Sequence, residues 1–271
     1  MRVQLPKIGL GCMGFTHAYG EPMEEKLAVE RIRAAYEMGY RFFDTAQRYT
    51  GIDHNGQIVY NETVVGEALK DVRQDVIIAT KCGITMRDGQ RIVDGRPETI
   101  RATLQESLKR LETDYVDIYY LHRTSGNVSV EEVAEAMGQL IEKDLIRGWG
   151  LSQVDVDLID RAQRITPLAA IQNIYSMVER DMEQEVIPYC LENNIGVVPF
   201  SPIASGLLSG KITVDTQFER YDDVRNWVPQ LSRRNIEGNQ PIVDLLRDFA
   251  TRKDATPAQI SLAWMLHKYP N

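Results

Sequence analysis

Four residues of different chemical type could together deliver a proton to a reacting oxygen: Asp44, Tyr49, Lys81 and His122. A phenol has a reference pKa near ~10, so Tyr49 needs a neighbouring positive charge to act as an acid near neutral pH. Lys81 can supply that charge, and Asp44 can keep the lysine charged and oriented. Neutral His122 can hydrogen-bond the same oxygen. Reduction of a carbonyl by hydride needs such a proton donor, because the developing alkoxide must receive a proton.

The elements that position these residues follow from the pattern of apolar residues. Short β-branched or aromatic runs alternate with longer segments of helical period, such as residues 100–111 and 133–141, which is typical of parallel βαβ units. Ser129 with Glu132 predicts a capped helix start, as does the run from Thr256 to Gln259. Seven strands are predicted: Lys7–Leu10, Arg41–Ala46, Val76–Thr80, Val116–Leu121, Ile146–Leu151, Ala169–Ile174 and Gly196–Phe200.

Polar residues stand where most of these predicted strands end. In a (β/α)8 barrel such positions converge on the C-terminal face, where active sites of that fold lie. In an open doubly wound sheet, strands far from the switch point would not bring them together. The sequence therefore predicts an α/β fold of the (β/α)8 TIM barrel type. The residues concerned are Asp44, Lys81, His122, Ser152, Gln153, Gln172 and Ser201.

Each candidate also has a structural interpretation. Tyr49 alone would more often be a surface or core tyrosine, and Asp44 could cap a loop. Lys81 and His122 follow apolar runs, where an unpaired charge is costly, so they are harder to dismiss. Asp117 lies within a predicted strand, and we interpret it as a structural hydrogen-bonding group. The joint occurrence of four complementary groups at one rim favours catalysis.

A second interpretation concerns Gly9, Gly11 and Gly14, which match the spacing of a dinucleotide-binding Rossmann turn. That motif must open a helix and meet an acidic residue about 20 positions on. Residues 15–22 instead have the composition of a loop, and Asp44 lies thirty residues past Gly14. The Rossmann interpretation is therefore disfavoured.

Three segments resemble sequence motifs of the aldo-keto reductases. They are residues 39–49 (GYRFFDTAQRY), 61–69 (NETVVGEAL) and 114–122 (DYVDIYYLH), and the match extends in family order across essentially all 271 residues. The resemblance implies a barrel enzyme that interconverts a carbonyl and an alcohol with NADPH (NADP+) as cofactor. It also implies that Asp44, Tyr49, Lys81 and His122 are the catalytic tetrad.

The same resemblance implies which residues bind the nicotinamide. It assigns the carboxamide to Ser152, Gln153 and Gln172, and stacking on the ring to Phe200, which from the sequence alone would more often be a core residue. Many members of the family have Asn after the serine, whereas this chain has the longer Gln153.

Two loops are expected near the cofactor. The glycine-containing loop with Met13 is implied to pass close to it, next to Asp44. The small-residue loop after the seventh strand can direct backbone N–H groups and hydroxyls at a pyrophosphate, and Lys211 adds positive charge. The resemblance places pyrophosphate contacts in this loop, at Ser201, Pro202, Ile203, Ala204, Ser205, Gly206 and Lys211.

The composition limits the classes of partner that this protein is expected to bind. A net charge of −8 and a pI near 5.2, with no cluster of Lys or Arg in the sequence, argue against nucleic acid and anionic membranes. No signal peptide or apolar stretch of membrane-spanning length is found, so a cytoplasmic protein is expected. Three cysteines without a CxxC pair are interpreted as reduced core thiols, and the histidines form no metal-binding motif. The expected partner is a small carbonyl substrate, while the oligomeric state is left open.

Length favours one barrel domain over residues 1–271. Only seven strands are countable, and the helix beginning at Pro257 is interpreted as the seventh barrel helix. We therefore expect a natural protein that continues into an eighth βα unit. The family also resembles channel-associated β subunits and lens proteins in which the barrel is a binding or structural module. Retention of all four catalytic residue types favours an enzyme.

Overall fold

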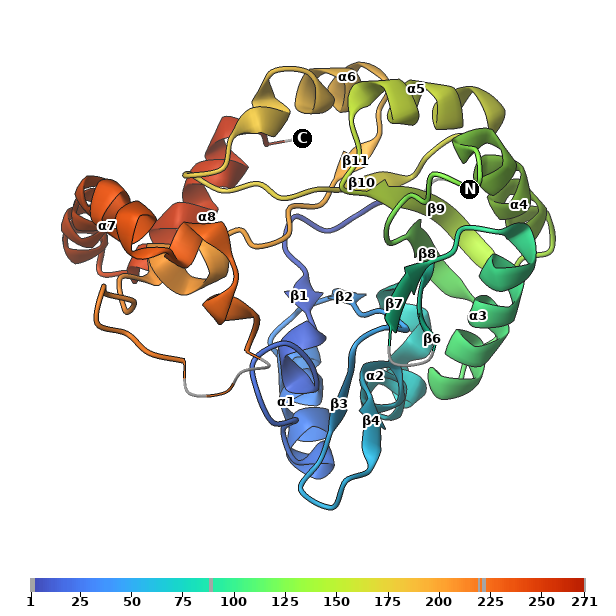
Figure 1. Cartoon of the computed structure of the whole chain (residues 1–271), viewed down its shortest axis with the longest axis horizontal. Coiled ribbons are helices and arrows are strands. Elements are labelled where there is room, and N and C mark those ends of the chain that lie inside the picture. The colour runs from blue at the N-terminus through green and yellow to red at the C-terminus, as the bar shows by residue number, and fades with distance from the viewer. Residues whose placement is uncertain (1–2, 88–89, 219, 221–222, 271) are drawn as a thin grey trace. The chain divides into compact units, whose positions relative to one another are not determined.

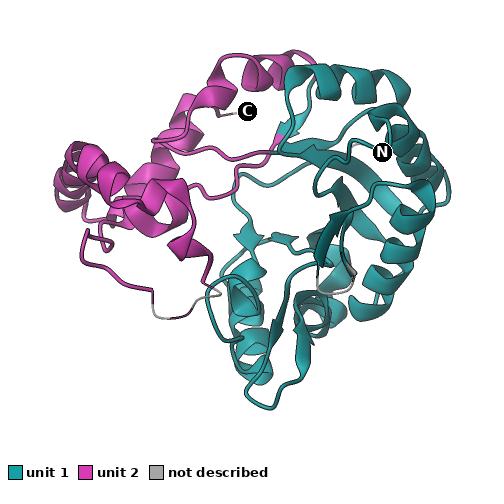
Figure 2. Cartoon of the chain, in the orientation of Figure 1, with its two compact units in different colours: residues 1–172, 194–196 teal, residues 173–193, 197–271 magenta. Residues whose placement is uncertain are grey.

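The computed structural model describes residues 3–87, 90–218, 220 and 223–270. The chain divides into two compact units (Figure 2). The first comprises residues 1–172 and 194–196, and the second comprises residues 173–193 and 197–271. The expectation of a single domain over residues 1–271 stays a prediction.

The first unit alternates strands and helices along the chain. Its helices are α1 (Glu25–Glu37), α2 (Asn61–Leu69), α3 (Pro97–Arg110), α4 (Val130–Glu142) and α5 (Val156–Ile165). Its main strands are β1 (Leu10–Gly11), β2 (Phe42–Asp44), β5 (Ile77–Cys82), β8 (Val116–Leu121), β9 (Ile146–Ser152) and β10 (Ala170–Gln172). All six lie within or beside predicted strands, and β8 has the predicted bounds. The capping box of Ser129 and Glu132 at the start of α4 is also confirmed.

The sheet keeps the order of the chain. Its seven strands run β1-β2-β5-β8-β9-β10-β11, where β11 is Gly196–Val197, and the pairs from β1 to β10 are parallel. Gly196, which belongs to the first unit, donates its N–H to the carbonyl of Ala169 at 3.0 Å. Each strand therefore pairs with its successor, as in a barrel wall and unlike a doubly wound sheet, whose order reverses at a switch point.

The sheet also curves strongly, and one hydrogen bond shows this. Gln172 Nε2 on β10 donates to Asp44 Oδ2 on β2 at 2.8 Å, although three strands lie between β2 and β10. Four strand spacings in a flat sheet would separate the two backbones by about 19 Å, which these side chains do not span. The sheet must therefore curl so that β2 and β10 face each other. Figure 1 shows α3, α4 and α5 along its outer side.

A largely buried ion pair between Arg73 and Asp117 helps to join β8 to β5. Asp117 on β8 accepts from the backbone N–H of Ile78 at 2.9 Å and from Arg73 Nη2 at 2.8 Å. Arg73 donates further to the carbonyls of Val76 and Tyr115. The structural role predicted for Asp117 is confirmed.

Two β-hairpins were not predicted from the sequence. They are formed by β3 (Thr50–Ile52) with β4 (Ile58–Tyr60), and by β6 (Ile84–Arg87) with β7 (Gln90–Val93). The composition of residues 84–96 indicates a loop that could shape the substrate site, but most of this segment belongs to the β6–β7 hairpin. Strands of three or four residues with exposed positions are too short for an alternating apolar pattern to be recognised.

The second unit is mainly helical, with α6 (Val186–Glu192), α7 (Arg233–Lys253) and α8 (Pro257–Lys268). The predicted capping box of Thr256 and Gln259 starts α8, and α7 was not predicted. The predicted strands 169–174 and 196–200 are shorter than expected, but Ile174 still forms a parallel bridge with Phe200. The unit has its own buried apolar cluster, made of Ala204, Leu207, Leu208, Ile212, Ile236, Val243 and Leu246.

Candidate active site

An aspartate, a lysine and a tyrosine form one buried chain of contacts in the first unit. Asp44 is the last residue of β2, Lys81 lies near the end of β5, and Tyr49 precedes β3. The Lys81 ammonium donates to Asp44 Oδ1, to the carbonyl of Thr45 at 2.8 Å and to the Tyr49 hydroxyl at 3.2 Å. Only 1% of Lys81 is exposed, so all three of its N–H donors have acceptors within the protein.

Charge on this lysine is favoured despite its burial. Burial by itself disfavours the ammonium, but the attraction of Asp44 and the Tyr49 oxygen outweighs it and raises the pKa of Lys81. The pKa of Tyr49 is also raised: burial raises it most, Lys81 opposes this and Asp44 adds to it. The sequence predicts that Lys81 makes the Tyr49 phenol more acidic. Its direction of influence is as expected, but burial prevails, so Tyr49 is protonated near neutral pH in the protein without cofactor.

His122 completes the group from the end of β8. Its ring centroid lies 5.8 Å from that of Tyr49, with the two planes at 84°. Its backbone N–H donates to the carbonyl of Cys82 at 2.9 Å, which holds it beside the end of β5. Burial, followed by the charges of Lys81 and Arg123, lowers the pKa of His122 to about 2. The imidazole is therefore neutral and can donate one hydrogen bond to a substrate oxygen.

Tyr49 is positioned by a buried network centred on Asn61, the first residue of α2. The Asn61 backbone N–H donates to the Tyr49 carbonyl at 2.9 Å. Its side-chain Nδ2 donates to the Cys12 carbonyl at 2.8 Å and to Thr16 Oγ1 at 2.9 Å, and Thr16 Oγ1 donates to the Tyr49 carbonyl at 3.3 Å. Thr45 Oγ1 donates to Asn61 Oδ1 at 2.6 Å. One amide therefore ties the loops after β1 and β2 to the start of α2.

Polar residues from β9 and β10 adjoin this group. Ser152 ends β9 and is 1% exposed, and Gln172 ends β10 and donates to Asp44. Gln153 has a left-handed backbone, with φ of 58°, and its N–H donates to the Gln172 carbonyl at 3.1 Å. A serine hydroxyl and side-chain amides offer the donors and acceptors that a carboxamide needs, so the residue types fit a nicotinamide.

The loop after β1 lies against the same residues. Cys12 donates its N–H to the Asp44 carbonyl at 2.8 Å, which places half-buried Met13 next to the site. Met13 begins a three-residue 3-10 turn, and the next α-helix starts only at Glu25. A Rossmann turn requires a helix directly after its glycines, so rejection of that motif is confirmed.

The remaining predicted cofactor residues lie in the second unit. Phe200 is half-buried, and the loop that follows contains left-handed backbone at Ser201, Ala204, Ser205 and Gly206, with φ between 50° and 101°. Non-glycine residues rarely adopt this conformation, so the loop is closely constrained. The carbonyl of Ile203 accepts from the N–H groups of Gly206 and Leu208. Pro202 precedes Ile203, and Lys211 is exposed just beyond the loop.

Sequence reasoning missed three contributors to the site. Arg123 donates from Nη1 to Ser152 Oγ at 3.1 Å. His17 stacks on Tyr49 at 5.8 Å between ring centroids, with its Nδ1 2.7 Å from the Thr50 carbonyl. Asn61 organises the network around Tyr49. Asn61 begins the family motif at residues 61–69 and Arg123 directly follows the motif at residues 114–122, but neither position by itself indicates a contact partner.

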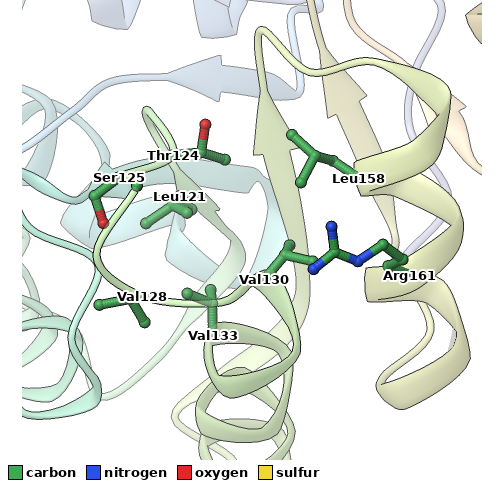
Figure 3. A pocket seen from close by; sticks show the side chains of 9 residues that line it. Leu121, Thr124, Ser125, Val128, Val130, Val133, Leu158 and Arg161 are labelled. Carbon is green, nitrogen blue, oxygen red and sulfur yellow. The ribbon is translucent and has the colours of Figure 1, made fainter.

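A separate cavity of about 260 Å³ lies between the end of β8 and helices α4 and α5 (Figure 3). Its walls include Leu121, Val130, Val133 and Leu158. Arg161 at its edge pairs with Glu131 at 2.8 Å, so its charge is already matched. This cavity lacks the convergent polar groups of the tetrad.

Further properties bear on the class of site. Among the described residues no group of three or more His, Cys, Asp or Glu side chains could hold a metal ion. The three cysteines are free and buried, as expected. None of the helices in the described part of the chain has the length and apolar character needed to cross a membrane.

Comparison with known proteins relates nearly the whole chain to one family. A sequence model of the aldo/keto reductase family matches residues 7–271. The chain is 37% identical over 267 residues to a probable aldo-keto reductase of Glycine max, covering 98% of this chain and 75% of the relative. It is similar in structure to a glycerol dehydrogenase from Gluconobacter oxydans, with a TM-score of 0.86, 26% identity, and coverage of 100% of this chain and 82% of the other. The holo form of an aldo-keto reductase from Bacillus halodurans gives a TM-score of 0.73 at 28% identity, with 96% and 78% covered.

Proposed function

Because the chain belongs to the aldo/keto reductase family of oxidoreductases, whose fold is the (β/α)8 barrel, we propose that it reduces an aldehyde or ketone to an alcohol with NADPH. The observation that carries the proposal is the buried Lys81 ammonium, which contacts both Asp44 and the Tyr49 hydroxyl beside a neutral His122. These are the groups needed to protonate an oxygen while its carbon accepts hydride.

Each of the four residues has a separate role in the reduction. Tyr49 gives its proton to the carbonyl oxygen, and His122 donates a hydrogen bond that orients that oxygen. Lys81 favours the phenolate that Tyr49 becomes, and Asp44 keeps Lys81 charged and directed. Burial makes these interactions stronger than they would be in water, because few water dipoles screen them.

The cofactor site is proposed from the residue types and the family resemblance. Ser152, Gln153 and Gln172 hold the carboxamide, Phe200 stacks on the ring, and Met13 lines the loop near Asp44. Residues 201–206 and Lys211 bind the pyrophosphate. When bound, NADPH supplies the hydride that forms the new C–H bond.

A second function is a barrel that binds cofactor but serves as a structural or interaction subunit. A structural subunit would not need a buried chain of proton-transfer groups. The ion pair of Lys81 and Asp44 is costly to bury and touches the Tyr49 hydroxyl, so the arrangement favours the enzyme.

The test is to mix the purified protein with NADPH and a reactive aldehyde such as 4-nitrobenzaldehyde and to follow cofactor absorbance. We expect turnover, and in Tyr49→Phe a loss of kcat of about 10² to 10⁴-fold with an unchanged Kd for NADPH. The control is Tyr36→Phe, whose hydroxyl contacts Asp75 at the surface. Retention of more than about a tenth of kcat in Tyr49→Phe would remove Tyr49 as the acid. Cofactor binding without turnover of any aldehyde would favour the structural alternative.

A further inference from the structure

Helix α2 begins with two consecutive buried polar residues, Asn61 and Glu62. Asn61 supports the loop that carries Tyr49, and Glu62 contacts β5 beside Lys81. We propose that Glu62 is a positioning residue, which fixes β5 against α2 and so keeps the Lys81 ammonium within hydrogen-bond distance of the Tyr49 hydroxyl. The inference rests on the proposed function and adds a residue that acts on the reaction without contacting the reacting atoms.

Glu62 is tied to β5 by a short hydrogen bond. Its Oε1 accepts from Thr80 Oγ1 at 2.6 Å, and both residues are buried. Thr80 directly precedes Lys81, and successive side chains of a strand point to opposite faces of the sheet. The Lys81 side chain contacts Asp44 and Tyr49, so Thr80 points away from the site. The bond to Glu62 therefore holds β5 from the side opposite to the Lys81 ammonium.

The second oxygen of Glu62 is paired with α3. Glu62 Oε2 accepts from Arg110 Nη1 at 3.1 Å, and only 1% of the Glu62 side chain is exposed. The two helices can approach this closely because Gly66 on α2 has no side chain: a Cβ there would lie 2.7 Å from the Arg110 carbonyl oxygen. A buried carboxylate is costly unless it is paired and hydrogen-bonded, so both contacts restrict the orientation of Glu62.

The contacts of Asn61 and Glu62 close a ring through the candidate active site. The Asn61 backbone N–H donates to the Tyr49 carbonyl at 2.9 Å, and the Tyr49 hydroxyl accepts from Lys81 at 3.2 Å. Lys81 follows Thr80, and Thr80 donates to Glu62, which follows Asn61. Each member of a closed ring is restrained from two sides, so loss of the bond between Thr80 and Glu62 frees β5 on one side.

The contact between Lys81 and Tyr49 is sensitive to such a loss. Its distance of 3.2 Å is already at the long end of the usual range for an N–H···O hydrogen bond. Misplacement of a catalytic group by about 1 Å can cost about 10²-fold in rate. A small shift of β5 away from α2 would therefore slow proton transfer while leaving the groups that bind cofactor and substrate in place.

The test removes the bond from each end and follows oxidation of NADPH with 4-nitrobenzaldehyde. Thr80→Val keeps the shape of the side chain and removes the donor, and Glu62→Ala removes the acceptor. We expect each variant to lower kcat about ten- to a hundredfold, with little change in KM for the aldehyde or in Kd for NADPH. The double variant should be no slower than the slower single variant, because all three lack the same bond.

Two further variants separate positioning from stability. Glu62→Gln keeps a group of equal length that can accept from the Thr80 hydroxyl or donate to it, so kcat should stay within about threefold of native. The control is Thr166→Val at the end of α5, whose hydroxyl donates to the Ala134 carbonyl at 2.7 Å. Its loss should lower the free energy of unfolding and leave kcat unchanged.

Thermal unfolding establishes which variants are folded at the assay temperature, and Thr80→Val with Glu62→Gln decide the question if Glu62→Ala does not fold. Native kcat in folded Thr80→Val would overturn the inference and leave the proposed function intact. The inference would also be wrong if the losses in Glu62→Ala and Thr80→Val multiplied in the double variant. Failure of the native protein to oxidise NADPH with any aldehyde would instead overturn the proposed function.

Discussion

The hydroxyl oxygen of Tyr49 lies 3.2 Å from Nζ of Lys81, in a setting where burial alone would make the phenol a weaker acid. Lys81 opposes the rise in the pKa of Tyr49 that burial causes, and Asp44 keeps Lys81 charged. Acidity at this site is therefore a property of three residues, and removal of any one changes the other two.

Replacement of Lys81 by Met should leave the pKa of Tyr49 under the upward influence of burial and without the cation that opposes it most. We expect kcat to fall by about 10² to 10⁴-fold, because the phenol then stabilises the transition state poorly. Steady-state kinetics with NADPH and 4-nitrobenzaldehyde across pH measures the loss. An unaltered pH profile would exclude Lys81 from the mechanism.

The same replacement leaves Asp44 as a buried carboxylate without its partner, which can cost about 3 to 5 kcal/mol of stability. The double variant Lys81→Met/Asp44→Asn removes that unpaired charge and serves as the control. It should recover stability without recovering kcat. Recovery of both would mean that the single variant was inactive because it was unfolded.

His122 should make stability depend on pH. Its pKa is lowered from 6.5 to about 2 in the folded protein, so below pH 6.5 only the unfolded chain takes up this proton. Stability is therefore lost as pH falls from about 6.5 towards 2. Between pH of about 7.5 and 5.5 the loss due to His122 should reach about 1.4 kcal/mol.

Urea unfolding of the native protein and of His122→Asn at both pH values isolates this contribution, since other groups titrate in both. The variant should lose less stability on acidification. An equal loss in the two proteins would show that His122 can be protonated in the folded state.

Asn61 should affect catalysis without touching the substrate. Asn61→Ala leaves the Cys12 carbonyl and the Thr16 and Thr45 hydroxyls without their amide partner. We expect a stability loss of about 1 to 3 kcal/mol per buried group left unsatisfied, and a lower kcat because the Tyr49 loop loses support. Thermal unfolding together with kcat and KM measures both effects. A folded variant with native kcat would make Asn61 purely structural.

Phe200 is proposed to stack on the nicotinamide. Phe200→Ala should weaken NADPH binding several-fold, because a stacked aromatic contact is worth about 0.5 to 1.5 kcal/mol beyond the area it buries. Fluorescence titration with NADPH gives the Kd, and kcat at saturating cofactor should change less. An unchanged Kd would assign Phe200 to packing in the second unit.

The sequence by itself was enough to identify the strands of the main sheet and the types of residue in the site. Strand β8 and the capped starts of α4 and α8 were predicted because each depends on a local pattern, either a continuous apolar run or a capping box. The candidate residues were recognised because polar side chains that end apolar strands are unusual. Their gathering followed from the rule that parallel strands of a barrel end on one face.

Only the tertiary structure decided how these residues act on one another. The hydrogen bond between Gln172 and Asp44 joins residues 128 positions apart, and the contact between Arg123 and Ser152 joins two strand ends. Neither contact can be predicted from the spacing of residues along the chain. The net pKa of Tyr49 likewise depends on burial by surrounding strands as well as on the charge of Lys81. Burial and long-range contact are properties of the folded chain, so no local pattern of residues could reveal them.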